Sequence, residues 1–171
     1  MLIELAAHDT GYKVREFTEN QFQLGKVSKM TVEGNKLRFY SLAGGKEKSA
    51  EETLGSLPLV VGPTFYGFVY NNWDSLMAGK TVKFRYCVLA RMETVGFELK
   101  KTDSAANQIR IQMKPTSFVI SLLVDPIHFT FLPDKTLVSL EGRVPPKIKK
   151  GNDWADLDAY EIYKSVAPAF R

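Results

Sequence analysis

The sequence predicts a mainly β (α+β) fold, a strongly curved antiparallel sheet or half-barrel wrapped around one central helix at about 64–78. Three observations support this fold class. Aromatic residues make up 12% of the chain, and flat side chains pack well on a pleated surface. Several segments alternate apolar and polar residues, which is the period of a half-buried strand. One segment, 64–78, has instead the three- and four-residue spacing of an amphipathic helix.

Composition and length narrow the class of protein. The chain has 171 residues and no internal repeat, low-complexity tract or interdomain linker, so residues 1–171 are predicted to form a single domain. The net charge is +4, but bases and acids alternate without a basic stripe beside stacking aromatics, so we expect no nucleic-acid partner. No run of roughly 18 apolar residues occurs, and we expect no transmembrane segment.

The first sixty residues predict a series of short strands. Segments 2–7 and 12–16 are short and weakly patterned, and residues 8–11 between them form a turn. Segments 27–32 and 36–42 alternate more clearly, and Glu33-Gly34-Asn35 joins them as a hairpin. Segment 47–52 is charged and is predicted as a strand or a loop.

The central segment is predicted to be one helix of about 15 residues. Pro63 fits the first turn, where its missing N–H costs nothing, and Gly79 fits the left-handed stop after the last turn. The apolar face of this helix would be formed by Phe65, Phe68, Val69, Trp73, Leu76 and Met77. An isolated helix of this length is marginal, so it must lie on a large apolar surface.

That surface is predicted to be a meander of amphipathic strands at 80–89, 92–101 and 109–113, with a polar turn at 102–107. The apolar run 118–124 fits a helix or a strand equally well. Further strands are predicted at 127–131 and 136–144, followed by an exposed, extended segment at 145–150 and an acidic loop at 153–158. A last edge strand is predicted at 159–166.

No residue carries a strong signal of catalysis. His8 lies in a turn, and His128 lies on the strand face opposite Ile127 and Phe129. Cys87 shares its strand face with Lys83 and Arg85, and nearby positive charge would lower its pKa, but the favoured interpretation is a passive cysteine beside surface lysines. The single cysteine excludes an intrachain disulfide and a multi-cysteine metal site. The expectation is therefore no catalytic residue, no metal and no cofactor.

Two blocks of the sequence resemble a group of uncharacterised bacterial β-rich proteins. The first is the stretch FYGFVYNNWDSLMAGKTVKF at 65–84, and the second comprises LLVDPI at 122–127 and FLPDKTL at 131–137. The architecture is also similar to the half-barrels of lipoprotein carriers and lipocalin-like proteins. No activity follows from this resemblance, because fold does not fix function. It implies export to the periplasm, with a signal segment preceding the sequence given.

These observations lead to three functional hypotheses. The first is a non-catalytic binding protein of the bacterial cell envelope, holding a hydrophobic small molecule or lipid in the concave face of the sheet. The second is an envelope assembly partner that pairs through sheet edges. The third is a small cofactor-free enzyme using His128, Tyr86 or Asp125. The predicted cavity lining for the first hypothesis is Phe65, Phe68, Trp73, Phe84, Tyr86, Phe97, Ile111 and Phe129.

Overall fold

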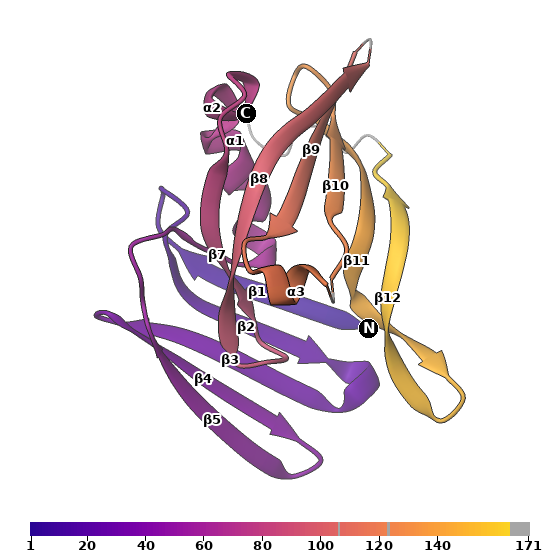
Figure 1. Ribbon diagram of the computed structural model, residues 1–171. Coiled ribbons are helices and arrows are strands. Elements are labelled where there is room, and N and C mark those ends of the chain that lie inside the picture. Colours follow the sequence, from indigo (N-terminus) through magenta and orange to yellow (C-terminus); the bar gives the residue numbers. More distant parts are fainter. Residues whose placement is uncertain (106, 123, 165–171) are drawn as a thin grey trace. The chain divides into compact units, whose positions relative to one another are not determined.

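The fold is mainly β, as predicted, and its described residues form two sheets (Figure 1). The computed structural model describes residues 1–105, 107–122 and 124–164. The chain divides into two compact units: unit 1 comprises Met1–Trp73 and Lys83–Phe97, and unit 2 comprises Asp74–Val82 and Glu98–Arg171.

Unit 1 contains a five-stranded antiparallel sheet with the strand order β1-β2-β3-β4-β5. Each strand pairs with the one next to it in the sequence, which is the meander expected for short connections. The predicted hairpin at Gly34-Asn35 is present, and Gly34 takes the left-handed φ of +61° that a tight turn needs. The strands are β1 (Leu2–His8), β2 (Val14–Gln21), β3 (Lys26–Glu33), β4 (Lys36–Ala43) and β5 (Lys46–Thr53).

The inner face of this sheet has an apolar part and a polar part. The cross-strand register aligns one apolar row, Ala6, Phe17, Met30, Phe39 and Ala50. On each strand, the residue two positions from the apolar row belongs to a second aligned row, which is polar: Glu4, Glu19, Ser28, Ser41 and Lys48. The two serine hydroxyls are buried and lie 3.2 Å apart, within hydrogen-bond distance.

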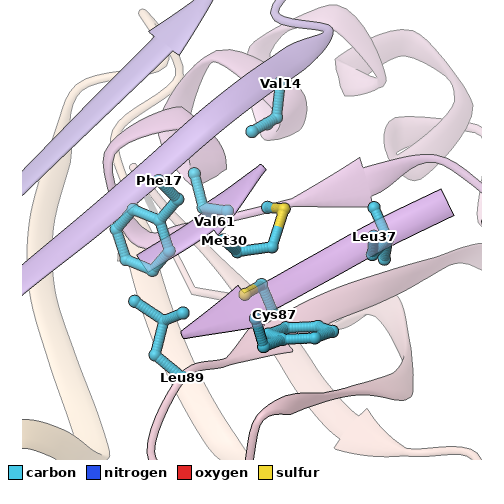
Figure 2. Close-up of a cluster of buried hydrophobic side chains, with 8 residues drawn as sticks. Val14, Phe17, Met30, Leu37, Val61, Cys87 and Leu89 are labelled. Atoms are coloured by element: carbon cyan, nitrogen blue, oxygen red, sulfur yellow. The ribbon is translucent and has the colours of Figure 1, made fainter. Parts of the chain in front are cut away.

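The core of unit 1 lies against the apolar row (Figure 2). Phe17, Met30 and Phe39 from the sheet are at most 2% exposed. The buried residues that complete this cluster come from several elements of the same unit: Val14, Leu37, Val61, Cys87 and Leu89. Removing any of the larger ones would leave a cavity, which costs about 2–5 kcal/mol in well-packed cores.

The rest of unit 1 consists of short elements on the chain that follows the sheet. Strand β6 (Leu59–Val60) pairs in parallel with β7 (Val82–Val88), so the fold is not purely antiparallel. A 3-10 turn (Gly62–Thr64) leads into helix α1 (Phe65–Asn71). Strand β8 (Glu93–Ala105) begins in unit 1 and continues in unit 2.

The predicted central helix is two short helices rather than one. Helix α1 ends at Asn71, and a separate helix α2 (Trp73–Met77) follows. The break is at Asn72, whose side-chain Nδ2 donates a hydrogen bond of 2.8 Å to the Phe68 carbonyl. Asparagine side chains bond readily to nearby backbone groups in this way, which makes asparagine common where a helix ends. Gly79 has the predicted left-handed φ, +76°.

Unit 2 contains the remaining residues of β8, followed by β9 to β12. Its elements are β9 (Gln108–Pro115), a short helix α3 (Phe118–Ser121), β10 (Ile127–Phe131), β11 (Leu137–Lys150) and β12 (Asp153–Ile162). Antiparallel ladders join β9 to β10, β10 to β11 and β11 to β12. The ambiguous run 118–124 thus begins as a helix, and its residue 123 lies outside the described residues.

Predictions for two segments of unit 2 are wrong. Strand β8 continues through most of the predicted polar turn at 102–107. The predicted acidic loop 153–158 is strand, within β12. The exposed, extended segment 145–150 is present and forms the end of β11. The acidic residues of β12 are paired across the ladder: the Arg143 guanidinium lies 2.6 Å from Asp156 and 2.8 Å from Asp158. The last edge strand therefore begins earlier than predicted, and residues 165–166 lie outside the described part of the chain.

Candidate functional site

Five of the eight predicted lining residues form one aromatic cluster in unit 1. The Phe84 ring lies 5.1 Å from Phe68, 6.3 Å from Phe65 and 6.1 Å from Phe97, measured between ring centroids. Tyr86 meets Phe97 edge-on at 6.1 Å. These are the separations of packed aromatic pairs. Phe84 is fully buried, so these rings contact one another as core side chains.

The other three predicted residues, Trp73, Ile111 and Phe129, lie on other elements. Trp73 is buried at the first residue of α2. Ile111 on β9 and Phe129 on β10 are directly opposed in the unit 2 sheet, and both are buried. All eight residues were predicted to line one cavity because alternation along a strand indicates which face a residue lies on. It does not indicate the compact unit to which the strand belongs.

A cleft of about 520 Å³ lies within unit 1, beside this cluster. It is bounded by the β1–β2 loop, the segment between β5 and β6, and helix α1. Its lining is Gly11, Tyr12, Lys13, Val14, Val32, Leu54, Gly55, Ser56, Leu57, Pro58, Leu59, Val60, Thr64, Phe68, Asn71 and Asn72. Of the eight predicted residues, Phe68 is in this lining. The volume falls within the range of small-molecule sites, about 300–1,000 Å³.

The loop that forms one wall of the cleft is fixed by local hydrogen bonds. The Asp9 carboxylate accepts hydrogen bonds of 2.9 Å from the backbone N–H groups of Gly11 and Lys13. These bonds hold the pKa of Asp9 below its ordinary value. Tyr12 follows in the left-handed region, with a φ of +61°, and its ring stacks on His8 at 5.2 Å.

Tyr12 also contacts helix α1 directly. A Cβ added at Gly67 would lie 2.4 Å from two atoms of the Tyr12 ring. Only glycine therefore allows the ring to approach the helix backbone this closely. The contact sets the distance between the β1–β2 loop and α1, and hence the width of the cleft at this end.

Burial changes in a regular way across the cleft. At its floor, Val14, Val60 and Thr64 are at most 3% exposed. The Thr64 hydroxyl donates to the Val61 carbonyl and accepts from the Val61 N–H, both at 3.2 Å. Because the Thr64 hydroxyl is bonded to the protein backbone, the floor offers a ligand mainly apolar contacts. At the rim, Lys13 and Asn71 are exposed.

A second feature of unit 1 is a pair of opposed carboxyl groups on the polar row. Glu4 on β1 faces Glu19 on β2 across the ladder, and Glu19 is 8% exposed. The Glu4 carboxylate also lies against Gly62, where an added Cβ would be 2.8 Å from Oε2. Burial, and then the charge of Glu19, raise the pKa of Glu4 to about 7. Glu4 thus changes protonation state near neutral pH.

The same surroundings keep two nearby groups uncharged. Burial, and then Glu4, raise the pKa of the Tyr86 phenol above its ordinary value. Burial, and then Glu19, raise the pKa of the Cys87 thiol. The alternative of a thiol pKa lowered by Lys83 and Arg85 is therefore excluded, because the thiol is buried in the core.

Glu52 ties β5 to β7 and β8 within unit 1. Its carboxylate accepts hydrogen bonds from Arg85 at 2.8 Å, from the Thr94 N–H at 2.7 Å and from the Thr94 hydroxyl at 2.5 Å. Arg85 in turn donates to the Thr94 hydroxyl at 2.7 Å. Thr94 is buried. These groups satisfy one another, so the cluster is structural and offers no open coordination to a ligand.

In unit 2, a second cleft of about 470 Å³ contains two of the three predicted acid–base residues, His128 and Asp125. Burial, and then Arg110, lower the pKa of His128. Within the described residues, the buried His128 Nδ1 has no hydrogen-bond partner. The rest of the lining is Pro126, Glu141, Gly142, Asp158, Ala159 and Tyr160. Glu141 is ion-paired with Arg110 at 2.6 Å, and Asp158 with Arg143.

Metal binding, membrane crossing and similarity to known proteins were each considered for this chain. In the described part of the chain, no group of three or more His, Cys, Asp or Glu side chains is arranged to hold a metal ion. Within the same residues, no helix has the length and apolar character needed to cross a membrane. Searches against models of protein families, curated proteins and solved structures find no match.

Sequence reasoning missed the residues that form the unit 1 cleft. The glycine at 67 inside a helical pattern was one available signal, because such a glycine indicates a close approach of another group. The alternation of β1, with Glu4 on the same face as Leu2 and Ala6, was a signal for an inward carboxyl group. The segment 54–60 had no such signal, since its side chains come together only through the tertiary fold.

Proposed function

We propose that this chain is a non-catalytic binding protein that holds a small hydrophobic or lipid-like ligand in the unit 1 cleft. The observation that supports this most is the cleft itself, which combines an apolar floor with a suitable volume. Half of its lining residues are valine, leucine, proline or phenylalanine. Sites for small molecules have this character, with a few polar groups for orientation.

The proposed ligand site is the unit 1 cleft, whereas the sequence predicted a cavity lined by the neighbouring aromatic cluster. The Phe84 ring contacts the rings of Phe65 and Phe97, whereas Phe68 also borders open volume. Strong curvature of the sheet, as in a half-barrel, remains part of the proposal because it would provide a concave face. The cell-envelope location is also part of the proposal and rests on the resemblance of segments 65–84 and 122–137.

The test is displacement of a hydrophobic fluorescent probe from the purified chain, with a variant at the rim of the cleft. Leu57 is 38% exposed and lines the cleft. Val27 is 40% exposed on β3 and lies outside the lining, so it is a matched control. Leu57→Asn should weaken probe binding by about fivefold, because part of a leucine contact of about 1 kcal/mol is lost. Val27→Asn should leave binding unchanged.

Absence of probe binding to the unaltered chain would refute the proposed function. Equal effects of the two substitutions would mean that the probe binds elsewhere. Native mass spectrometry of the freshly purified chain gives an independent measurement, since a retained natural ligand adds a defined mass.

A second candidate function is pairing with another protein strand, which the position of β1 favours. β1 is the first strand in the order of the five-stranded sheet. Its outward residues Ile3 and Leu5 are 37% and 62% exposed. A terminal strand with apolar side chains is a template for strand addition. Light scattering tests this candidate: self-association that Leu5→Lys abolishes would support it, and a monomer at all concentrations would argue against self-pairing.

A further inference from the structure

The polar residues of the unit 1 cleft are distributed unevenly, and this distribution bears on the kind of ligand. Among the described residues that line the cleft, Lys13 is the one with a charged side chain. It is exposed at the rim, whereas the floor is formed by Val14, Val60 and the internally bonded Thr64. A ligand with its apolar part on this floor would therefore present its other end to Lys13.

The rim also retains hydrogen-bonding capacity. Among the described residues, neither the Lys13 ammonium nor the Asn71 side-chain amide has a hydrogen-bond or ion-pair partner. The Asn72 amide differs, because its Nδ2 already donates to the Phe68 carbonyl. Asp9 is the nearest acid in sequence, and its charge interacts with that of Lys13, while its Oδ1 accepts the backbone N–H groups of Gly11 and Lys13. Asp9 therefore balances part of the Lys13 charge, and the Lys13 ammonium keeps its hydrogen-bond donors for a ligand at the mouth of the cleft.

We propose that the unit 1 cleft binds a single-chain amphiphile with an anionic head, its tail on the apolar floor and its head beside Lys13 and Asn71. This inference rests on the proposed function, since it names the ligand class of the same site. A flexible lysine with an apolar stem suits such a position, because the stem lines the wall while the ammonium stays in water. The amide of Asn71 adds two donors for the oxygens of the head.

Two amphiphiles that differ only in the head group test this inference. Laurate and lauryl alcohol have the same tail, and both displace a hydrophobic fluorescent probe from an apolar cleft. A solvent-exposed ion pair is weak, so laurate is expected to bind about threefold to fivefold more tightly than the alcohol at low salt. Raising the ionic strength should reduce this preference, because exposed charges are screened.

Substitution identifies the residue responsible. Lys13→Gln should abolish the preference for laurate over lauryl alcohol. Lys46, exposed on β5 and outside the lining, provides the control, and Lys46→Gln should retain the full preference. Circular dichroism of both variants confirms that they fold alike.

The outcomes separate this inference from the function on which it rests. Equal affinity of the unaltered chain for laurate and lauryl alcohol would overturn the anionic head and leave hydrophobic binding in place. A preference that persists in Lys13→Gln would overturn the assignment to this cleft mouth. Binding of neither compound would overturn both the inference and the proposed function.

Discussion

Replacement of Glu4 by glutamine is expected to change how the stability of the chain depends on pH. Glu4 faces Glu19 on the inner face of the five-stranded sheet, and its pKa is raised from 4.5 to about 7. Between these two values the folded chain holds a proton that the unfolded chain releases. The slope of unfolding free energy against pH is then negative, so this group makes the chain less stable as the pH rises from about 4.5 to about 7.

The size of the effect follows from the same two values. A pKa of about 7 in the folded chain and 4.5 in the unfolded chain corresponds to at most about 3 kcal/mol. Glu4 is only half-buried, and solvent screening reduces the electrostatic part, so about 1–2 kcal/mol is the expected loss between pH 5 and pH 8. Glu4→Gln removes the titration, and this variant should be more stable than the unaltered chain by that amount at pH 8.

The measurement is urea unfolding at several pH values between 5 and 8, followed by circular dichroism. Glu16→Gln is the matched control, because Glu16 lies on the same strand as Glu19 but forms an exposed ion pair with Lys29. The control should keep the pH dependence of the unaltered chain. The reasoning is refuted if Glu4→Gln and the unaltered chain show parallel stability profiles across this range.

Two further substitutions test the contacts that build unit 1. Gly67→Ala should destabilise the chain by about 1–3 kcal/mol in thermal unfolding and weaken probe binding, because its Cβ would lie 2.4 Å from the Tyr12 ring. Gly55→Ala, in the same cleft but with no atom within 4 Å, should change stability by less than about 0.5 kcal/mol, and equal effects would contradict the close contact. Glu52→Ala should cost about 1–3 kcal/mol in urea unfolding, since it leaves the buried Thr94 N–H without its partner. Glu51→Ala, which breaks exposed ion pairs, should cost less than about 1 kcal/mol, and a larger loss there than at Glu52 would exclude this explanation.

The strands of unit 1 could be predicted because their signals are local. Segment 36–42 alternates clearly, and Gly34-Asn35 has the chemistry of a tight turn. Both features need no information about distant residues, and the structure contains the hairpin at this place. The left-handed Gly79 could be predicted for the same reason.

The full extent of the two C-terminal strands could not be predicted, because the stability of the end of β11 and the start of β12 depends on the partner strand. Asp156 and Asp158 suggest a solvated loop when the sequence is taken alone. In the structure they face Lys147 and Arg143 across the β11–β12 ladder, and opposite charges stabilise such pairs. The prolines at 145 and 146 also suggested a break, but they lie in the register shift between Val144 and Lys147. A bulge tolerates proline because no ladder hydrogen bond is needed there.

The candidate site was predicted only in part, and the reason is similar. Phe68 could be placed on an apolar helix face from its spacing alone. The cleft beside it depends on the Tyr12 ring contacting Gly67, which brings together residues 55 positions apart in the sequence. The glycine inside the helical pattern indicates a close approach of some group, but without the fold nothing identifies that group as the Tyr12 ring.

The polar row of the five-stranded sheet also protects the chain against misaligned pairing during folding. A slip of two residues keeps every side chain on its own face, so burial of apolar groups alone would tolerate it. Such a slip between β3 and β4 would set Ser28 against Phe39 or Ser41 against Met30. In either direction the two hydroxyls separate and lose their shared hydrogen bond inside the protein. A single pair of small alcohol side chains thus discriminates between one correct alignment and the two nearest errors.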